Sequence, residues 1–287
     1  MVGSREGIAC PEHLHRERPS VRRHQLLKSL HELLQPRSYF EIGVSTGLSM
    51  RLSRTKSVGV DPFFTIEKEL HCDLHLVRSS SDEFFARRHP FAHFDEPVID
   101  LAFIDGMHLS EYALRDVINT ERHTRSTSVI VIDDMLPREV PEAARARVTR
   151  AWTGDVYKMI AAFEAYRPDL VCLQVNTTPT GTAVLLLPDP SSTALAEQYD
   201  ALVEEFVVPD PQVVPQPILD RTRAIEPERL LEAPIWEDLR RLRSVPDPVA
   251  RPQVRALLET AGLLGPQGTS AQDGRDSRPT TPASALR

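Results

Sequence analysis

The sequence has few cysteines and no long apolar run. Cys10, Cys72 and Cys172 are odd in number and widely spaced, so they form neither a disulfide framework nor a zinc motif. The first twenty residues are polar and lack the apolar core of a secretory signal. No stretch approaches the 18 uncharged apolar residues that cross a bilayer. We therefore expect a cytoplasmic protein without a membrane partner.

The chain also lacks an excess of basic residues. Its formal net charge is −7, whereas general nucleic-acid binding usually needs a basic face. We therefore expect no nucleic-acid partner. Hydrophobic residues make up 41% of the 287 positions, which is enough for a complete core in one large domain with additions, or in two small domains.

Short apolar runs alternate with segments of helical periodicity between Val21 and Leu187. This alternation predicts an open α/β sheet with helices on both faces. No helical segment separates the last two apolar runs, so these should form an antiparallel hairpin at one edge. The expected strands are Ser38–Ile42, Ser57–Val60, Leu74–Val77, Val98–Ile104, Ser128–Ile132, Leu170–Val175 and Thr182–Leu187. The expected helices are Val21–Leu34, one starting at Leu48–Ser53, Asp82–Arg88, Ser110–Thr124 and Asp155–Tyr166.

Composition changes after Leu187, and the chain turns proline-rich beyond Val208, where half of the 24 prolines lie. We expect a flexible arm over residues 1–19 and a main domain over 20–208. A proline-rich extension with short helices should follow over 209–264. Residues 265–287 are rich in Gly, Pro, Ser, Thr and Gln, which is typical of disorder.

The first strand ends in a glycine loop, residues 43–47, which follows Glu41 in the pattern Glu41-x-Gly43-x-x-x-Gly47. Gly43 lets the backbone turn tightly and approach a ligand, and Gly47 allows close packing at a helix start. Free backbone N–H groups there can hold a carboxylate. The spacing is not that of a dinucleotide fingerprint or a nucleotide-triphosphate loop. A turn without a ligand remains the alternative.

This pattern resembles the first motif of class I S-adenosylmethionine-dependent methyltransferases. The resemblance implies a Rossmann-like doubly wound sheet of seven strands in the order 3-2-1-4-5-7-6, with the last strand antiparallel. It also implies that Glu41, Gly43 and Gly47 bind S-adenosylmethionine, with Ser45 or Thr46 near the carboxylate of the cofactor.

Further cofactor contacts are expected beyond the second and third strands. Asp61 ends the second strand, where a carboxylate can accept hydrogen bonds from two ribose hydroxyls, and the family has an acid at this position. The alternative is an Asx turn before Pro62. The resemblance also brings Ser80 and Ser81 to the adenine ring, although small polar residues suit any helix start.

Carboxylates follow the fourth and fifth strands: Asp105, Asp133 and Asp134. These strands are neighbours in the family's order, so the three side chains should converge and suit Mg²⁺. Such an ion would lower the pKa of a substrate hydroxyl and orient it. The resemblance also implies that Asp105 contacts the cofactor. Alternatively, Asp105 caps a helix and one of the two later aspartates is a turn residue.

His108 lies three residues after Asp105, where metal-dependent catechol-type O-methyltransferases usually have a basic residue, most often a lysine. A histidine can remove a proton near neutral pH, although it could also be a local hydrogen-bond partner. The run Phe103-Ile104-Asp105-Gly106-x-His108, together with Val131-Ile132-Asp133-Asp134, is similar to a bacterial group with enzymes that methylate sugar hydroxyls.

The segment after the fifth strand should border the substrate. Trp152 could stack on a flat acceptor or seal the helix against the sheet, and Asp155 is a second candidate for substrate contact. Thr153 is the expected N-cap of the following helix. Arg145, Arg147 and Arg150 form a basic run that could attract an anionic substrate or be a solvated face.

We therefore predict a methyltransferase that acts on a small-molecule hydroxyl, with S-adenosylmethionine as cofactor and Mg²⁺ as a possible second one. A different enzyme on the same sheet, hydroxylase-like or nucleotide-sugar-modifying, is the first alternative. A catalytically silent binding module is the second. Sugar, polyketide, catechol-like ring and lipid acceptors all fit, and a homo-oligomer is left open.

Overall fold

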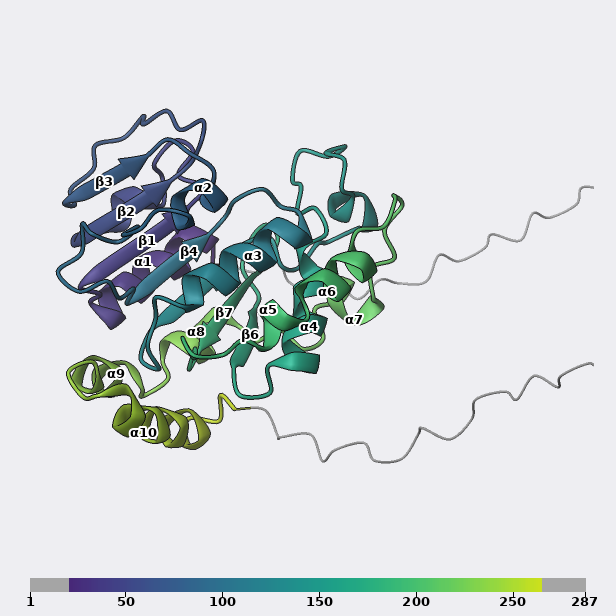
Figure 1. Cartoon of the computed structure of the whole chain (residues 1–287). Coiled ribbons are helices and arrows are strands. Elements are labelled where there is room, and N and C mark those ends of the chain that lie inside the picture. Colours follow the sequence, from purple (N-terminus) through teal and green to yellow (C-terminus); the bar gives the residue numbers. More distant parts are fainter. Residues whose placement is uncertain (1–20, 265–287) are drawn as a thin grey trace, which may run out of the picture.

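Seven strands form one mixed sheet in the computed structural model, which describes residues 21–264 (Figure 1). The strand order is β3-β2-β1-β4-β5-β7-β6, and β7 alone runs antiparallel to its neighbours. The predicted Rossmann-like fold, strand order and edge hairpin are confirmed. The arm predicted for 1–19 and the tail predicted for 265–287 lie outside the described residues. The strands are β1 (Ser38–Ile42), β2 (Lys56–Val60), β3 (Leu74–Val77), β4 (Leu101–Ile104), β5 (Val129–Ile132), β6 (Val171–Val175) and β7 (Thr182–Leu186).

Helices cover both faces of the sheet because the buried strands carry apolar side chains on both sides. On one face, Ile42, Ile104 and Ile132 pack in one core with residues of α2 to α6. None of the helices in residues 21–264 is long and apolar enough to cross a membrane. The helices of this face are α2 (Ser81–Phe85), α3 (Ser110–Glu121), α4 (Met159–Tyr166), α5 (Ala194–Glu197) and α6 (Tyr199–Phe206), with the short 3₁₀ turns η2 (Val140–Ala143) and η3 (Val156–Lys158) nearby.

The other face is covered by helices from the two ends of the described chain. Phe103 and Val131 of the sheet pack in one core with Leu30 of the first helix and with Trp236 and Val254 of the proline-rich extension. Residues 209–264 contain short helices, and three of them, α8, α9 and α10, complete this core. These elements are α1 (Arg23–Leu34), α8 (Pro227–Leu231), α9 (Trp236–Leu242) and α10 (Asp247–Thr260); α7 (Gln216–Leu219) belongs to the opposite core.

The prediction of a helix that starts at Leu48 is wrong. The glycine loop is followed by a single 3₁₀ turn, η1 (Met50–Leu52). Only eight residues, 48–55, join the loop to β2. As a helix they would span about 12 Å, whereas the return along a five-residue strand takes about 17 Å. The chain must therefore be more extended than a helix there.

His31 of α1 is buried without a full set of partners. Its ring lies edge-on to Tyr39 at 4.6 Å between centroids, and Nε2 makes no hydrogen bond. Burial, helped by the charge of Arg54, lowers the pKa of His31 from 6.5 to about 4. The folded protein therefore holds this ring neutral under conditions in which the unfolded chain protonates it.

We expect this histidine to make the fold acid-sensitive. Between pH 6.5 and 4 the unfolded state binds more protons than the folded state, so the free energy of unfolding falls by about 3 kcal/mol as pH drops through this window. His31→Phe should remove most of that loss in urea unfolding measured at pH 7 and pH 4. The exposed His71→Phe should retain it, and equal acid losses in all three proteins would contradict the prediction.

Candidate active site

The polar residues after four parallel strands meet at one edge because the strands end in register. Ile42 pairs with both Val60 and Ile104, and Ile104 pairs with Ile132. The following residues continue the ladder: Gly43 N–H donates to the Val60 carbonyl, and Asp105 and Asp133 N–H donate to Ile42 and Ile104. The candidate site therefore has a rigid base, at the place where α/β sheets bind ligands.

Gly43 brings the ends of β1 and β4 into close contact. Its φ is +88°, and a Cβ at this position would lie 1.9 Å from the carbonyl oxygen of Asp105. No other residue type fits this approach. Gly47, at φ +80°, packs against Ile66 and Leu70 and therefore serves the loop and not a helix start.

Glu41 lies beneath the glycine loop and is fully buried. Its carboxyl oxygens accept hydrogen bonds from the Tyr39 hydroxyl and the Ser49 hydroxyl, each at 2.6 Å. Burial raises the pKa of Glu41 to about 8. In this structure the side chain supports the loop from within the core and does not point to open space.

Asp61 fixes the glycine loop from the neighbouring strand. Its Oδ2 accepts from Ser45 N–H at 2.7 Å, and its Oδ1 accepts from Phe63 N–H at 2.6 Å. The second bond is the Asx turn considered as an alternative. The segment after Pro62 also pairs with the loop, because Glu67 N–H donates to the Thr46 carbonyl. The loop, Asp61 and this segment form one unit.

Ser80 and Ser81 lie at the start of α2. Ser80 caps the helix, accepting from Glu83 N–H at 3.2 Å in a capping box. Ser81 forms a hydrogen bond with Asp116, whose pKa is raised by burial to about 7. The Ser80 hydroxyl thus caps α2 and Ser81 links α2 to Asp116 of α3, and the predicted adenine contact stays a prediction.

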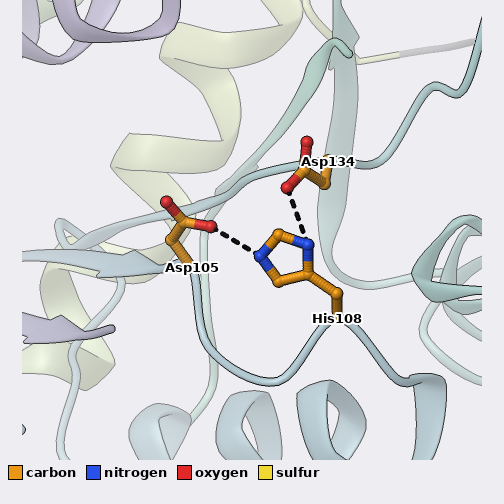
Figure 2. A group of neighbouring side chains, drawn as sticks. All are labelled: Asp105, His108 and Asp134. Atoms are coloured by element: carbon orange, nitrogen blue, oxygen red, sulfur yellow. Dashed lines mark hydrogen bonds and ion pairs between the residues drawn. The ribbon is translucent and has the colours of Figure 1, made fainter. Parts of the chain in front are cut away.

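His108 bridges two of the predicted carboxylates. Figure 2 shows the imidazole ring between Asp105 and Asp134, with Nε2 at 3.0 Å from Asp105 Oδ1 and Nδ1 at 3.0 Å from Asp134 Oδ2. Nδ1 also lies 2.9 Å from the Trp152 carbonyl oxygen. All these partners are acceptors, so both ring nitrogens donate, as in a protonated histidine. Asp105, His108 and Asp134 present ligand atoms within 4.8 Å of one another.

Asp133 completes the cluster from a more buried position. Neither of its carboxylate oxygens makes a well-directed hydrogen bond, and the Oδ2 atom contacts Nη1 of Arg23 at 2.5 Å. The Arg23 guanidinium also lies 3.9 Å from Asp105 and 4.0 Å from Asp134. Arg23 thus lies within 4.0 Å of all three aspartates, and His108 bridges two of them.

The electrostatics of the cluster hold His108 protonated. Burial alone would lower its pKa, but the hydrogen bond to Asp105 and the charge of Asp134 outweigh burial and raise the pKa to about 9. Burial raises the pKa of Asp134 to about 6 and that of Asp133 well above its usual value. At neutral pH His108 is therefore a cation in this arrangement and has no free nitrogen to accept a proton.

We expect Asp105→Asn to lower the pKa of His108 by one unit or more from about 9. The substitution removes an anionic acceptor at 3.0 Å from Nε2, while burial, which lowers the pKa, stays. An NMR titration of the imidazole carbon-bound protons measures the change. Asp95→Asn removes an exposed carboxylate elsewhere and should leave the value unchanged. A pKa that stays near 9 in Asp105→Asn would sink the prediction.

Trp152 supports His108 through its ring and its backbone. The two rings stack at 5.2 Å between centroids and 15° between planes. The indole Nε1 donates to the Ala144 carbonyl, which anchors the ring. The next glycine, Gly154, lies against the His108 backbone, and a Cβ there would be 1.7 Å from the His108 carbonyl oxygen. One face of Trp152 is thus occupied by the histidine and is not available for stacking on an acceptor.

Asp155 is a structural residue, contrary to its predicted contact with substrate. It is fully buried, its Oδ1 accepts from Ser110 N–H at 2.8 Å, and its Oδ2 contacts Arg145 and Lys158. It therefore caps α3 from a distant part of the chain. Thr153 is not an N-cap either, because its hydroxyl donates to backbone carbonyls, including that of Glu142.

A cleft of about 480 Å³ opens beside His108 and Asp134. Its volume suits a small molecule. We call it the His108 cleft, and its lining residues are Arg23, His108, Asp134, Arg138, Glu139, Glu142, Arg147, Thr149, Arg150, Ala151, Trp152, Pro179 and Thr180.

Sequence reasoning missed Arg23 and Thr180. The Thr180 hydroxyl donates to Asp134 Oδ1, and no pattern in the β6–β7 turn marks this role. Arg23 carried one signal: it is the first residue of α1, and a basic residue at a helix N-terminus is unfavourable for the helix dipole. An acidic partner elsewhere in the fold would offset this unfavourable interaction, so such a partner could have been expected.

A known family model matches the part of the chain that carries the strand-end residues. Residues 40–135, about a third of the chain, match the family model of a methyltransferase domain. This stretch runs from β1 through the glycine loop to the residues after β5, and it contains the whole acidic cluster. The match confirms the predicted resemblance to class I methyltransferases over these residues. No curated protein matches the sequence.

Solved structures with a similar course of the chain include three methyltransferases. The O-methyltransferase TomG from Streptomyces achromogenes shares 16% identity over 58% of this chain and 79% of its own, with a TM-score of 0.40. The Bacillus cereus O-methyltransferase shares 14% over 57% and 80%, with a TM-score of 0.40. The Podospora anserina methyltransferase PaMTH1 shares 11% over 58% and 78%, with a TM-score of 0.41.

Proposed function

We propose that this protein is an S-adenosylmethionine-dependent O-methyltransferase that acts on a small-molecule hydroxyl with the help of a divalent cation. The observation that carries the proposal is the placement of Asp105, His108 and Asp134 beside a glycine loop, at the carboxyl ends of β1, β4 and β5. The methyltransferase-domain match over 40–135 supports the same conclusion.

The glycine loop and its neighbours are the proposed cofactor site. Gly43, Ser45, Thr46 and Gly47 would follow the methionine part, and Asp61 would accept hydrogen bonds from the ribose. Each carboxylate oxygen can accept more than one bond, so the bonds from Ser45 and Phe63 to Asp61 leave acceptor capacity. The remaining proposed contacts are Ser80, Ser81 and Asp105, while Glu41 supports the loop from the core.

The acidic residues fit a divalent cation. Asp133 has two buried carboxylate oxygens without well-directed hydrogen bonds, and Arg23, its cationic partner, also faces Asp105 and Asp134. One arginine therefore offsets the charge of three buried or half-buried carboxylates only in part. Oxygen ligands suit Mg²⁺. Asp105, Asp133 and Asp134 would hold the ion. When bound, it lowers the pKa of the acceptor hydroxyl and orients that hydroxyl.

The reaction moves one methyl group by in-line displacement. The acceptor oxygen forms a bond to the methyl carbon while the bond from that carbon to the sulfonium breaks and leaves its electron pair on sulfur. The sulfonium is already activated, so alignment and deprotonation are the main tasks of the protein. The products are a methyl ether and S-adenosylhomocysteine.

His108 is the proposed acceptor of the hydroxyl proton. Trp152 holds the ring in place through its stack and its carbonyl contact at Nδ1. Nε2 contacts Asp105 at 3.0 Å, so it would become available to the substrate only when Asp105 binds the cation instead. His108 can act as a base only when Asp105 and Asp134 no longer keep it protonated. The proposal therefore requires the negative charge of these carboxylates to be offset in the active state.

Calorimetry with S-adenosylhomocysteine, with and without Mg²⁺, tests the proposal. We expect binding of the cofactor product, and binding of Mg²⁺ that is lost in Asp133→Asn while affinity for the cofactor product is kept. Absence of cofactor binding at millimolar concentration would overturn the methyltransferase assignment. Cofactor binding without any effect of Mg²⁺ would overturn the proposed role of the cation but not the methyltransferase assignment.

Arg23 should compete with the cation for the carboxylates. Its guanidinium contacts Asp133 at 2.5 Å, and two cations repel each other strongly at such distances. Arg23→Gln is therefore expected to tighten Mg²⁺ binding by about tenfold or more in calorimetry, which is ~1.4 kcal/mol. Arg22→Gln, an exposed neighbour, is the matched control. Unchanged or weaker Mg²⁺ binding in Arg23→Gln would show that the arginine does not compete.

A further inference from the structure

The His108 cleft has a cationic rim in an acidic protein. The whole chain carries a net charge of −7, yet four arginines line this one cleft. Two of them are neutralised by buried carboxylates. Arg23 pairs with Asp133, and Arg138 Nε donates to Glu142 at 2.9 Å.

The charges of the other two, Arg147 and Arg150, are not offset by a carboxylate within residues 21–264. Both are exposed, and neither has a carboxylate partner among residues 21–264. Arg147 Nη2 donates to the Arg150 carbonyl at 3.1 Å, which ties the two residues of this short loop together. Their guanidinium groups are therefore free to bind an anion from the cleft.

The rest of the basic run does not share this arrangement. Arg145 turns away from the cleft to Glu111 and Asp155, at 2.6 and 2.7 Å. The run is thus divided by function: Arg145 fixes the loop to α3 and η3, and the next two arginines line the opening. A uniformly solvated basic face would show no such division.

Trp152 lies between the unpaired arginines and His108, because both Arg147 and His108 contact its ring. The Arg147 guanidinium carbon lies 6.0 Å from the centre of the indole ring, and that ring stacks on His108 at 5.2 Å. A molecule in the cleft can therefore reach both the imidazole and the guanidinium groups. Of the carboxylates at the cleft, Asp134 and Glu142 already have cationic partners, which leaves Glu139 as the one opposing charge in the described lining.

From this geometry we infer that the methyl acceptor carries an anionic group, a carboxylate or a phosphate, which Arg147 and Arg150 bind while a hydroxyl of the acceptor faces His108. The inference rests on the proposed methyltransferase function and names its substrate class. Guanidinium groups bind both kinds of anion through paired, charge-assisted hydrogen bonds. Unpaired cations at the mouth of a cleft also increase the rate at which anions enter.

Three matched sugars test the inference by calorimetry on the full-length protein with Mg²⁺ and S-adenosylhomocysteine present. Glucose 6-phosphate, glucuronate and glucose offer similar hydroxyls with a phosphate, a carboxylate and no charge. We expect at least one of the two anionic sugars to bind about tenfold or more tightly than glucose, and the preferred one identifies the anion. Their affinity should fall as salt increases.

Substitutions in the rim complete the test. Arg147→Gln and Arg150→Gln should each weaken binding of the anionic sugar by about tenfold, the scale of one charge-assisted hydrogen bond, without changing affinity for S-adenosylhomocysteine. Arg88→Gln removes an exposed arginine beyond α2 and should have no effect. Equal binding of the three sugars, no binding of any, or an unchanged preference in both rim variants would overturn the inference. Loss of S-adenosylhomocysteine binding in the wild type would instead overturn the proposed function.

Discussion

Replacing Asp133 by asparagine is expected to stabilise the metal-free protein by about 1–2 kcal/mol and to abolish its response to Mg²⁺. The carboxylate is buried and lacks well-directed hydrogen bonds. Burial, followed by the charges of Asp134 and Asp105, raises its pKa well above the usual value. The folded state therefore disfavours the ionised carboxylate, and the stability cost grows as pH rises above the unfolded pKa of 3.8. Asparagine removes this cost. It does not leave Arg23 without an anionic partner, because Asp105 and Asp134 lie 3.9 and 4.0 Å from the guanidinium.

The same change should remove function. Asp133 is one of three proposed ligands of the cation, and such ions contribute several kcal/mol to catalysis. We expect methyl transfer to fall about a thousandfold or more, once an acceptor is available. Urea unfolding without metal and calorimetry with Mg²⁺ measure the two opposite effects.

Asp100→Asn provides the control with the opposite sign. Asp100 is equally buried but accepts a hydrogen bond from Arg37 N–H at 2.8 Å, so its replacement should destabilise the protein by about 1–3 kcal/mol. A loss of stability in Asp133→Asn comparable to that of Asp100→Asn, with Mg²⁺ binding retained, would show that Asp133 is an ordinary structural aspartate.

Replacing Arg167 by methionine is expected to lower the free energy of unfolding by about 3–5 kcal/mol. The arginine is 1% exposed, and its guanidinium donates to both oxygens of Glu121, at 2.5 and 2.8 Å. Methionine fills part of the space but leaves Glu121 buried on α3 with a single remaining hydrogen bond, from Asp189 N–H at 2.9 Å. The lost stability reflects this uncompensated charge more than the loss of the ion pair.

A second substitution separates these causes. Adding Glu121→Met to Arg167→Met removes the stranded carboxylate, so the double variant should recover at least half of the lost stability. Arg223→Met, which breaks the exposed pair with Glu164, should cost less than about 1 kcal/mol. Denaturant unfolding of the wild type and these three variants tests the prediction. If the double variant is no more stable than Arg167→Met alone, the ion pair itself stabilises the fold.

The sequence predicts the sheet and the strand-end residues well because both depend on local patterns. Buried parallel strands are short apolar runs, and Asp61, Asp105 and Asp133 directly follow such runs. Parallel strands in register then bring those residues to one edge without further information. The antiparallel hairpin was predictable for a similar reason, since no helix fits between β6 and β7.

The errors have non-local causes. The missing helix after Gly47 follows from the length of chain available before β2, which local propensity does not report. Asp155 and Thr153 looked like helix-start residues, but Asp155 serves a different helix, 45 residues away in sequence at Ser110. Arg23 reaches the acidic cluster only because α1 lies against the sheet. Contacts between residues so distant in sequence leave no periodic pattern from which they could be predicted.

The layer that joins α1 to α8, α9 and α10 has a consequence for how the protein is made. During synthesis the sheet can assemble once β7 has emerged, but the face of the sheet that carries Phe103 and Val131 stays open until residues 227–264 follow. Domains on the ribosome usually fold from the N-terminus as chain becomes available. Here the last described helices close the core, so a nascent chain that stops at Leu187 presents an apolar face to its surroundings.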